Sequence, residues 1–186
     1  MPHVVLFHSI LGLRTVERDL AATLAGDGHV VTLPDLYAGQ SADNYKAGFR
    51  LKEATGEAPI MDRARAALRN APPDAVLAGI SFGAYLVGQF WGERPRMPGA
   101  LLIAGGAQWA PTLRHQLPVQ VHVARPDPFD EEAFFAHWLD SNPGVALEFY
   151  RYDGVGHYFL DANLPDFDRN SAQLCLARCQ QFLRGL

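Results

Sequence analysis

Six short apolar runs, most of them rich in valine, isoleucine and leucine, alternate along the chain with longer amphipathic segments. Most of the runs are continuously apolar, which is typical of strands that other elements cover on both faces. The runs occupy 3–8, 29–34, 75–80, 100–105, 119–124 and 145–152. The amphipathic segments have the apolar spacing of helices and occupy 15–25, 61–70, 82–91, 131–139 and 165–183.

This alternation of strand and helix predicts an α/β fold in three layers, with about six mainly parallel strands and helices on both faces of the sheet. We expect residues 1–186 to form one such domain. In a parallel sheet, ligands and reactive residues gather at the carboxyl ends of the strands. The segment 37–59 follows the second strand and is longer than a simple connection. It is expected to form a helix or a mobile excursion that walls a pocket, or else a surface insertion without a role.

Composition and charge narrow the classes of function. With 48% apolar and 19% charged residues, the 186-residue chain is suited to a buried core and not to intrinsic disorder. The net charge of −4 offers no basic surface for nucleic acid or an anionic membrane. No run approaches the ~20 apolar residues of a membrane helix, and His8 and Ser9 interrupt the N-terminal run before a secretion signal could form. We therefore expect a cytoplasmic protein.

The two cysteines, Cys175 and Cys179, lie four positions apart in the last predicted helix. No further cysteine or histidine accompanies them at the spacing of a metal site, so the sequence predicts that they pack in the core. No metal and no cofactor are expected.

Residues 79–83 read GISFG, a G-x-S-x-G pentapeptide between a predicted strand and a predicted helix. This is the arrangement of a nucleophile elbow, in which the serine sits on a sharp turn with its hydroxyl exposed above the sheet. Gly79 and Gly83 would allow the backbone to approach closely at this turn. Ser81 is therefore the candidate nucleophile. The alternative is a glycine-rich turn that carries an unreactive serine.

A nucleophilic serine needs a general base, and the base needs a carboxylate that orients it. His157 is the predicted base, because it follows the last predicted strand in a loop whose glycines leave the imidazole room to reach Ser81. Competing histidines lie within a predicted strand or helix, or at the start of a strand: His122, His137, His3 and His29.

Asp127 is the predicted orienting carboxylate, because it follows the fifth strand at its carboxyl end. Asp153 remains an alternative, since it is only four residues from His157. Asp130 and Glu131 read instead as the first turn of the next helix, where carboxylates interact favourably with the helix dipole.

Two backbone N–H groups are candidates for an oxyanion hole. The N–H of Phe82 follows the serine at a helix N-terminus, and the N–H of Ile10, or of a neighbour, lies in the loop after the first strand. The alternative for that loop is a simple connector. Position near strand ends further suggests that aromatic residues line a pocket, and the candidates are Tyr37, Phe49, Trp109, Tyr158 and Phe159.

Over most of its length the sequence resembles the dienelactone hydrolase family, a compact branch of the α/β-hydrolases. The resemblance is carried by HSILG (8–12), LPDLYAG (33–39), GISFG (79–83), ARPDPF (124–129) and GVGHYF (154–159). It implies an α/β-hydrolase fold reduced to a minimal core without a cap domain. By the same matching, Ser81, His157 and Asp127 would form a catalytic triad, and Ile10 and Phe82 would donate the oxyanion-hole N–H groups.

The sequence departs from the family's namesake at three positions. Ser81 stands where the namesake has a nucleophilic cysteine, and Ser9 where it has a glutamate that helps control the thiolate. Asp161 stands where an arginine binds the namesake's substrate carboxylate, and an acid there would repel an anionic substrate.

The resemblance and its departures together predict a serine hydrolase that cleaves a small, neutral ester or lactone through an acyl-enzyme. Ser9, Tyr37 and Tyr158 are the expected substrate contacts. No partner beyond this substrate is expected, and the protein would be a monomer or homodimer. Two alternatives stay open: a thioesterase or acyltransferase with the same triad, and a non-catalytic binding protein of the same fold.

Overall fold

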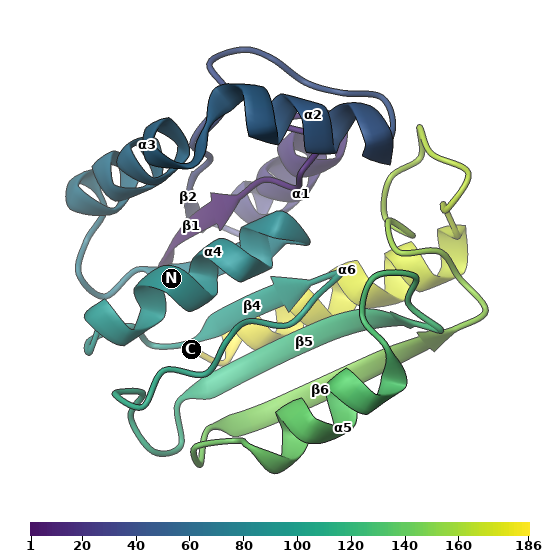
Figure 1. Ribbon diagram of the computed structural model, residues 1–186. Coiled ribbons are helices and arrows are strands. Elements are labelled where there is room, and N and C mark those ends of the chain that lie inside the picture. Colours follow the sequence, from purple (N-terminus) through teal and green to yellow (C-terminus); the bar gives the residue numbers. More distant parts are fainter.

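The computed structural model describes residues 1–186, and its six strands form one parallel sheet in the order β2-β1-β3-β4-β5-β6 (Figure 1). The strands are β1 (His3–Phe7), β2 (Val30–Thr32), β3 (Val76–Ile80), β4 (Ala100–Ile103), β5 (Pro118–Arg125) and β6 (Ala146–Asp153). Every neighbouring pair is parallel. The six predicted strands and their parallel arrangement are confirmed.

Helices cover both faces of this sheet (Figure 1). They are α1 (Thr15–Gly26), α2 (Tyr45–Thr55), α3 (Glu57–Asn70), α4 (Phe82–Phe90), α5 (Glu132–Asp140) and α6 (Arg169–Arg184). Helices α3, α4 and α5 pack on one face, and α1 and α6 pack on the other. None of the helices combines the length and the apolarity that crossing a membrane would require.

The continuous apolar runs are explained by these two layers of helices. Along β1, Val5 and Phe7 point into the core under α3 and α4, whereas Val4 and Leu6 point into the core under α1 and α6. All four side chains are fully buried. Since successive residues of a strand face opposite sides of the sheet, a strand covered on both sides must be apolar at every position.

The segment 37–59 contains α2 and the first residues of α3, so the expected helix is present there. Asn44 caps α2 by accepting the N–H of Ala47 at 3.0 Å, and Gly56, at a φ of +83°, separates α2 from α3. Helix α3 therefore begins at Glu57 and not at 61 as predicted. Helix α6 likewise begins at Arg169 and not at 165, because the Asp168 side chain accepts the N–H of Ser171.

Candidate active site

Ser81 lies on the turn between β3 and α4, in a backbone conformation that is rare for a residue with a side chain. Its φ and ψ are 54° and −109°. The turn is held on both sides, since the Ser81 N–H donates to the Ile103 carbonyl at 2.7 Å and the Ser81 carbonyl accepts the N–H of Ala84 at 2.8 Å. Strained backbone of this kind persists only where the surrounding structure enforces it, and it is common at active sites.

Two glycines make the turn possible. A Cβ on Gly79 would lie 2.1 Å from the Gly83 carbonyl carbon, and a Cβ on Gly83 would lie 2.2 Å from the Phe7 carbonyl oxygen. Both separations are far below van der Waals contact. The glycines of the GISFG motif therefore allow α4 to pack directly against β3 and β1, which fixes the direction of the Ser81 side chain.

Ser81, His157 and Asp127 form a continuous chain of hydrogen bonds. The Ser81 Oγ lies 2.9 Å from His157 Nε2, and His157 Nδ1 lies 2.7 Å from Asp127 Oδ2. The three residues follow β3, β6 and β5 at the carboxyl ends of these strands. With Nδ1 donating to the carboxylate, Nε2 can accept the proton of the serine hydroxyl.

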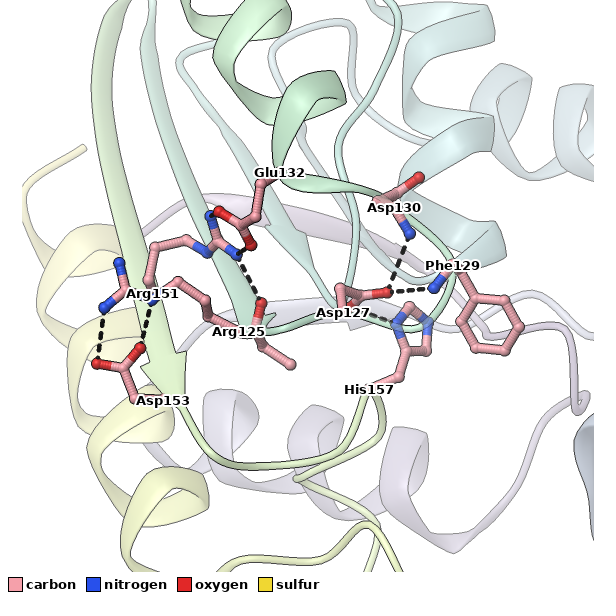
Figure 2. A network of polar contacts seen from close by, with 9 residues as sticks. Arg125, Asp127, Phe129, Asp130, Glu132, Arg151, Asp153 and His157 are labelled. Carbon is pink, nitrogen blue, oxygen red and sulfur yellow. Dashed lines mark hydrogen bonds and ion pairs between the residues drawn. The ribbon is translucent and has the colours of Figure 1, made fainter.

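The surroundings of Asp127 favour its ionised form. Burial alone would raise its pKa, but the hydrogen bond and charge of His157, together with backbone N–H groups, hold the pKa of Asp127 below its ordinary value. Those N–H groups belong to Phe129 and Asp130, at 2.9 and 3.3 Å from Oδ1 (Figure 2). Burial and the Asp127 charge instead raise the pKa of Asp130. Two neighbouring carboxyl groups are thus shifted in opposite directions.

Two ion pairs beside Asp127 brace the ends of β5 and β6 (Figure 2). Arg125 binds Asp153 across the two strands, with its NH2 group 2.9 Å from Oδ2. Arg151 binds Glu132 at the start of α5 at 2.6 Å and also donates to the Ala124 carbonyl at 3.0 Å. Asp153 therefore points away from His157, and of the two carboxylates considered from the sequence only Asp127 meets the imidazole.

The loop after β1 brings Ile10 to the same end of the sheet. The buried carboxylate of Glu17 holds this loop by accepting the N–H of Ser9 at 3.1 Å and of Arg14 at 3.0 Å. The Ile10 N–H makes no hydrogen bond within the chain. The N–H of Phe82 lies in the first turn of α4, where backbone N–H groups have no hydrogen-bond acceptor inside the helix. Both residues border the same cavity as Ser81. The anchoring role of Glu17 was not predicted, and its one local signal is its position three residues after Arg14, the N-cap of α1.

A cavity of about 750 Å³ opens above Ser81 and is bordered by His157. Nine of its 21 lining residues are phenylalanine, tyrosine or tryptophan, and Trp109 and Trp138 stack within it with ring centroids 4.2 Å apart. Four aromatic side chains at its rim remain substantially exposed, namely Phe49, Tyr85, Phe129 and Phe134. They are half of the exposed large hydrophobic side chains of the chain, so apolar surface is concentrated at this opening.

Of the five aromatic residues predicted to line a pocket, Phe49, Trp109 and Tyr158 border the cavity. Tyr37 and Phe159 do not, because both are fully buried in the core. The ring of Tyr37 packs edge-on against His8 with centroids 4.8 Å apart. Four further aromatic residues that line the cavity were not predicted from the sequence, namely Tyr45, Phe129, Phe134 and Trp138. They lie on α2 and in or beside α5, and their positions depend on how these segments fold over the strand ends.

Ser9 and Asp161 also lie outside the cavity. Ser9 is buried, and its Oγ accepts the Leu11 N–H at 3.4 Å. Asp161 is buried and pairs with Arg14 at 2.7 Å. The expectation that Asp161 repels an anionic substrate is therefore wrong, because an arginine neutralises its charge away from the cavity. Ser9 likewise does not reach the space where a substrate could bind.

The two cysteines pack in the core as predicted, and the structure also brings a histidine to them that the spacing of the sequence did not reveal. His122 Nε2 lies 3.6 Å from Cys179 Sγ, and the two sulfur atoms are 3.9 Å apart. All three side chains are fully buried and of metal-binding type. The ring nitrogens of His122 also meet the Tyr152 hydroxyl and the Gln120 Oε1, both at 2.8 Å. These hydrogen bonds give His122 a satisfied place in the core, as buried polar groups require.

Solved structures share this fold over nearly the whole chain. A protein from Klebsiella pneumoniae subsp. pneumoniae, named for dienelactone hydrolase, aligns with a TM-score of 0.76 at 17% identity, covering 100% of this chain and 88% of that one. A dienelactone hydrolase-like promiscuous phosphotriesterase from metagenomic libraries aligns with a TM-score of 0.76 at 18% identity, over 99% and 86% of the two chains. An α/β-superfamily protein from Xanthomonas campestris pv. campestris aligns over 100% of both chains, with a TM-score of 0.64 and 19% identity.

No curated protein matches the sequence. The family model of the dienelactone hydrolases, in contrast, matches residues 1–186, which is the entire chain. The parallel sheet, the strained serine turn and this full-length match agree, and the chain belongs to the dienelactone hydrolase family of the α/β-hydrolase superfamily.

Proposed function

We propose that the protein hydrolyses a carboxylic ester or lactone through an acyl-enzyme formed on Ser81. The observation that supports this most strongly is the chain of hydrogen bonds from Asp127 through His157 to Ser81 at the floor of the cavity. A serine hydroxyl is a poor nucleophile until a base accepts its proton. The 2.9 Å contact with His157 supplies that base.

In the first half-reaction the Ser81 Oγ attacks the carbonyl carbon while its proton passes to His157 Nε2. Asp127 stabilises the imidazolium that forms, and it holds the ring in the tautomer that can accept the proton. The N–H groups of Ile10 and Phe82 donate to the oxyanion. His157 then gives its proton to the leaving alcohol as the ester C–O bond breaks.

In the second half-reaction water takes the place of the alcohol. His157 accepts a proton from water as it attacks the acyl carbon, and it returns that proton to the Ser81 Oγ when the acid is released.

The lining of the cavity points to an apolar, aromatic or otherwise bulky substrate. Aromatic side chains such as Trp109 and Trp138 contribute large contact areas and stack on flat apolar groups. The exposed rim formed by Phe49, Tyr85, Phe129 and Phe134 would extend this contact beyond the enclosed volume. We therefore propose a substrate larger than the small ester expected from the sequence alone.

A panel of 4-nitrophenyl esters tests this function. We expect hydrolysis of all of them, with kcat/KM rising from acetate to octanoate and 1-naphthoate because the larger acyl groups contact the aromatic wall. A marked preference for acyl thioesters over oxygen esters would instead indicate a thioesterase. Absence of turnover on every ester and thioester would favour the binding protein.

Phe134→Ala separates the role of the rim from that of the triad. Removing this ring should lower kcat/KM for 1-naphthoate about tenfold and leave acetate nearly unchanged, since loss of an apolar contact affects only substrates that reach it. Leu174→Ala is the matched control, because Leu174 is a similarly exposed apolar residue on α6 and does not border the cavity. Equal losses on both esters would contradict a role in substrate selection.

A further inference from the structure

Tyr158 follows the candidate base directly and carries a hydroxyl that is buried at the active site without a partner. The side chain is only 4% exposed, and its hydroxyl makes no hydrogen bond. Tyr158 borders the same cavity as Ser81 and Ile10, and the polar groups beside its hydroxyl are those of Ser81, Ser9 and the Ile10 backbone. It is thus a neighbour of both the candidate nucleophile and a candidate oxyanion donor.

The ring that carries this hydroxyl is held firmly. Its backbone N–H donates to Asp166 Oδ2 at 3.0 Å. Its face stacks on Tyr45, with centroids 5.2 Å apart and an angle of 17° between the planes, and it packs against His157 at 4.8 Å. Tyr45 is itself tied to Asp166 by a hydrogen bond from its hydroxyl. The position of the Tyr158 hydroxyl is therefore fixed before any substrate binds.

A buried hydroxyl without a hydrogen bond destabilises the folded protein, because the group loses its water and gains nothing in return. A group of this kind calls for an explanation, and functional sites are one place where such local defects are kept. The Tyr158 hydroxyl differs from that of Tyr37, which also has no partner, because Tyr158 borders the cavity and Tyr37 does not. Here the missing partner would be an acceptor that lies in the cavity beside Ser81 and Ile10, and the oxyanion of an ester-cleavage intermediate is such an acceptor.

We propose that the Tyr158 hydroxyl is a third donor to the oxyanion, beside the N–H groups of Ile10 and Phe82. This inference rests on the proposed ester hydrolysis and adds a catalytic residue to it. The donor comes from the loop that carries the base, whereas the two backbone donors come from the loop after β1 and from α4.

The chemistry keeps the proton of Tyr158 in place. As the bond between Ser81 Oγ and the carbonyl carbon forms, the Oγ proton moves to His157 Nε2 and the π electron pair of the carbonyl moves onto its oxygen. The Tyr158 O–H donates a hydrogen bond to that oxygen and does not ionise. Burial raises the pKa of Tyr158 to about 12, so the phenol remains a neutral donor at physiological pH.

Comparison of Tyr158→Phe with Tyr37→Phe tests the assignment. Both hydroxyls are buried and without a partner, but that of Tyr37 does not border the cavity. We expect Tyr158→Phe to lower kcat about 10²-fold, as loss of one oxyanion donor does, with KM nearly unchanged. Its affinity for a boronic acid, which forms a tetrahedral adduct on the serine, should fall in parallel. Tyr37→Phe should leave both values unchanged.

Stability measurements complete the test. Because the Tyr158 hydroxyl has no partner, Tyr158→Phe should unfold at the same temperature as the wild type or higher. A kcat within twofold of the wild type would overturn the proposal, and so would a lowered unfolding temperature, which would reveal a structural partner. If the wild type itself hydrolyses no ester and a fluorophosphonate does not label it, the proposed function fails. If only the difference between the variants is missing, this inference fails alone.

Discussion

Asp127 Oδ2 lies 2.7 Å from His157 Nδ1, although the two residues are thirty positions apart, whereas Asp153, only four positions before His157, is bound to Arg125. Proximity along the chain is therefore a poor guide to which carboxylate orients the imidazole. The loops after β5 and β6 meet because these strands are neighbours in the sheet. Asp153 is the last residue of the edge strand β6, and its side chain is exposed.

Asp127→Asn should lower kcat for ester hydrolysis by about 10⁴, since an amide at this position favours the wrong imidazole tautomer. Asp153→Asn is the matched control and should change kcat less than twofold, because it breaks only an exposed ion pair. Steady-state kinetics on one activated ester measure both variants. A larger loss for Asp153→Asn would reassign the orienting acid.

Ser81→Gly should be more stable than Ser81→Ala by about 1 kcal/mol. The positive φ of Ser81 strains any residue with a Cβ, and glycine releases that strain. Both variants should lose turnover, because neither has a hydroxyl. Urea unfolding of the two inactive proteins gives the comparison, and equal stability would mean that the turn is not strained.

Gly83→Ala should destabilise the fold by about 3 kcal/mol, since its new methyl group would collide with the Phe7 backbone and force α4 away from β1. Gly26→Ala, at the end of α1, is the control, because a Cβ there meets no atom within 4 Å. Thermal unfolding of the two variants should separate them clearly. Similar unfolding temperatures would show that α4 is free to shift.

The two neighbouring carboxyl groups should influence stability with opposite dependence on pH. The lowered pKa of Asp127 stabilises the fold above the unfolded-state value of about 4, and this contribution disappears as pH falls through the folded-state pKa. The raised pKa of Asp130 has the opposite effect on stability, because ionisation of this carboxyl group as pH rises destabilises the fold. Relative to the wild type, Asp127→Asn should therefore lose stability at pH 7, and Asp130→Asn should gain it.

Urea unfolding at pH 7 and pH 3 measures this difference. The difference in free energy of unfolding between each variant and the wild type should shrink toward pH 3, where the native carboxyl groups approach their neutral forms. If both variants changed the free energy of unfolding in the same direction at pH 7, the opposite pKa shifts of Asp127 and Asp130 would be contradicted.

The order of strands and helices and the meeting of Ser81, His157 and Asp127 could be anticipated from local patterns. Ser81 directly follows the third strand, and Asp127 and His157 lie in the loops after the fifth and sixth strands, at the same edge of the sheet. The residues that line the cavity could not be anticipated from such patterns. Tyr37 also follows a strand, yet its ring turns into the core, while Phe134 reaches the cavity from α5. Side-chain direction in such segments depends on tertiary packing, which no local pattern encodes. The approach of His122 to Cys179 was missed for the same reason, because it joins β5 to α6 across 57 positions.

Labelling with a fluorophosphonate, followed by peptide mass spectrometry, tests the central claim most directly. The reagent forms a covalent adduct with a serine whose hydroxyl is activated by a neighbouring base. We predict a single adduct on Ser81 in the wild type, and its loss in His157→Ala with the fold intact. Failure to label Ser81, or equal labelling of the wild type and His157→Ala, would contradict a serine activated by His157.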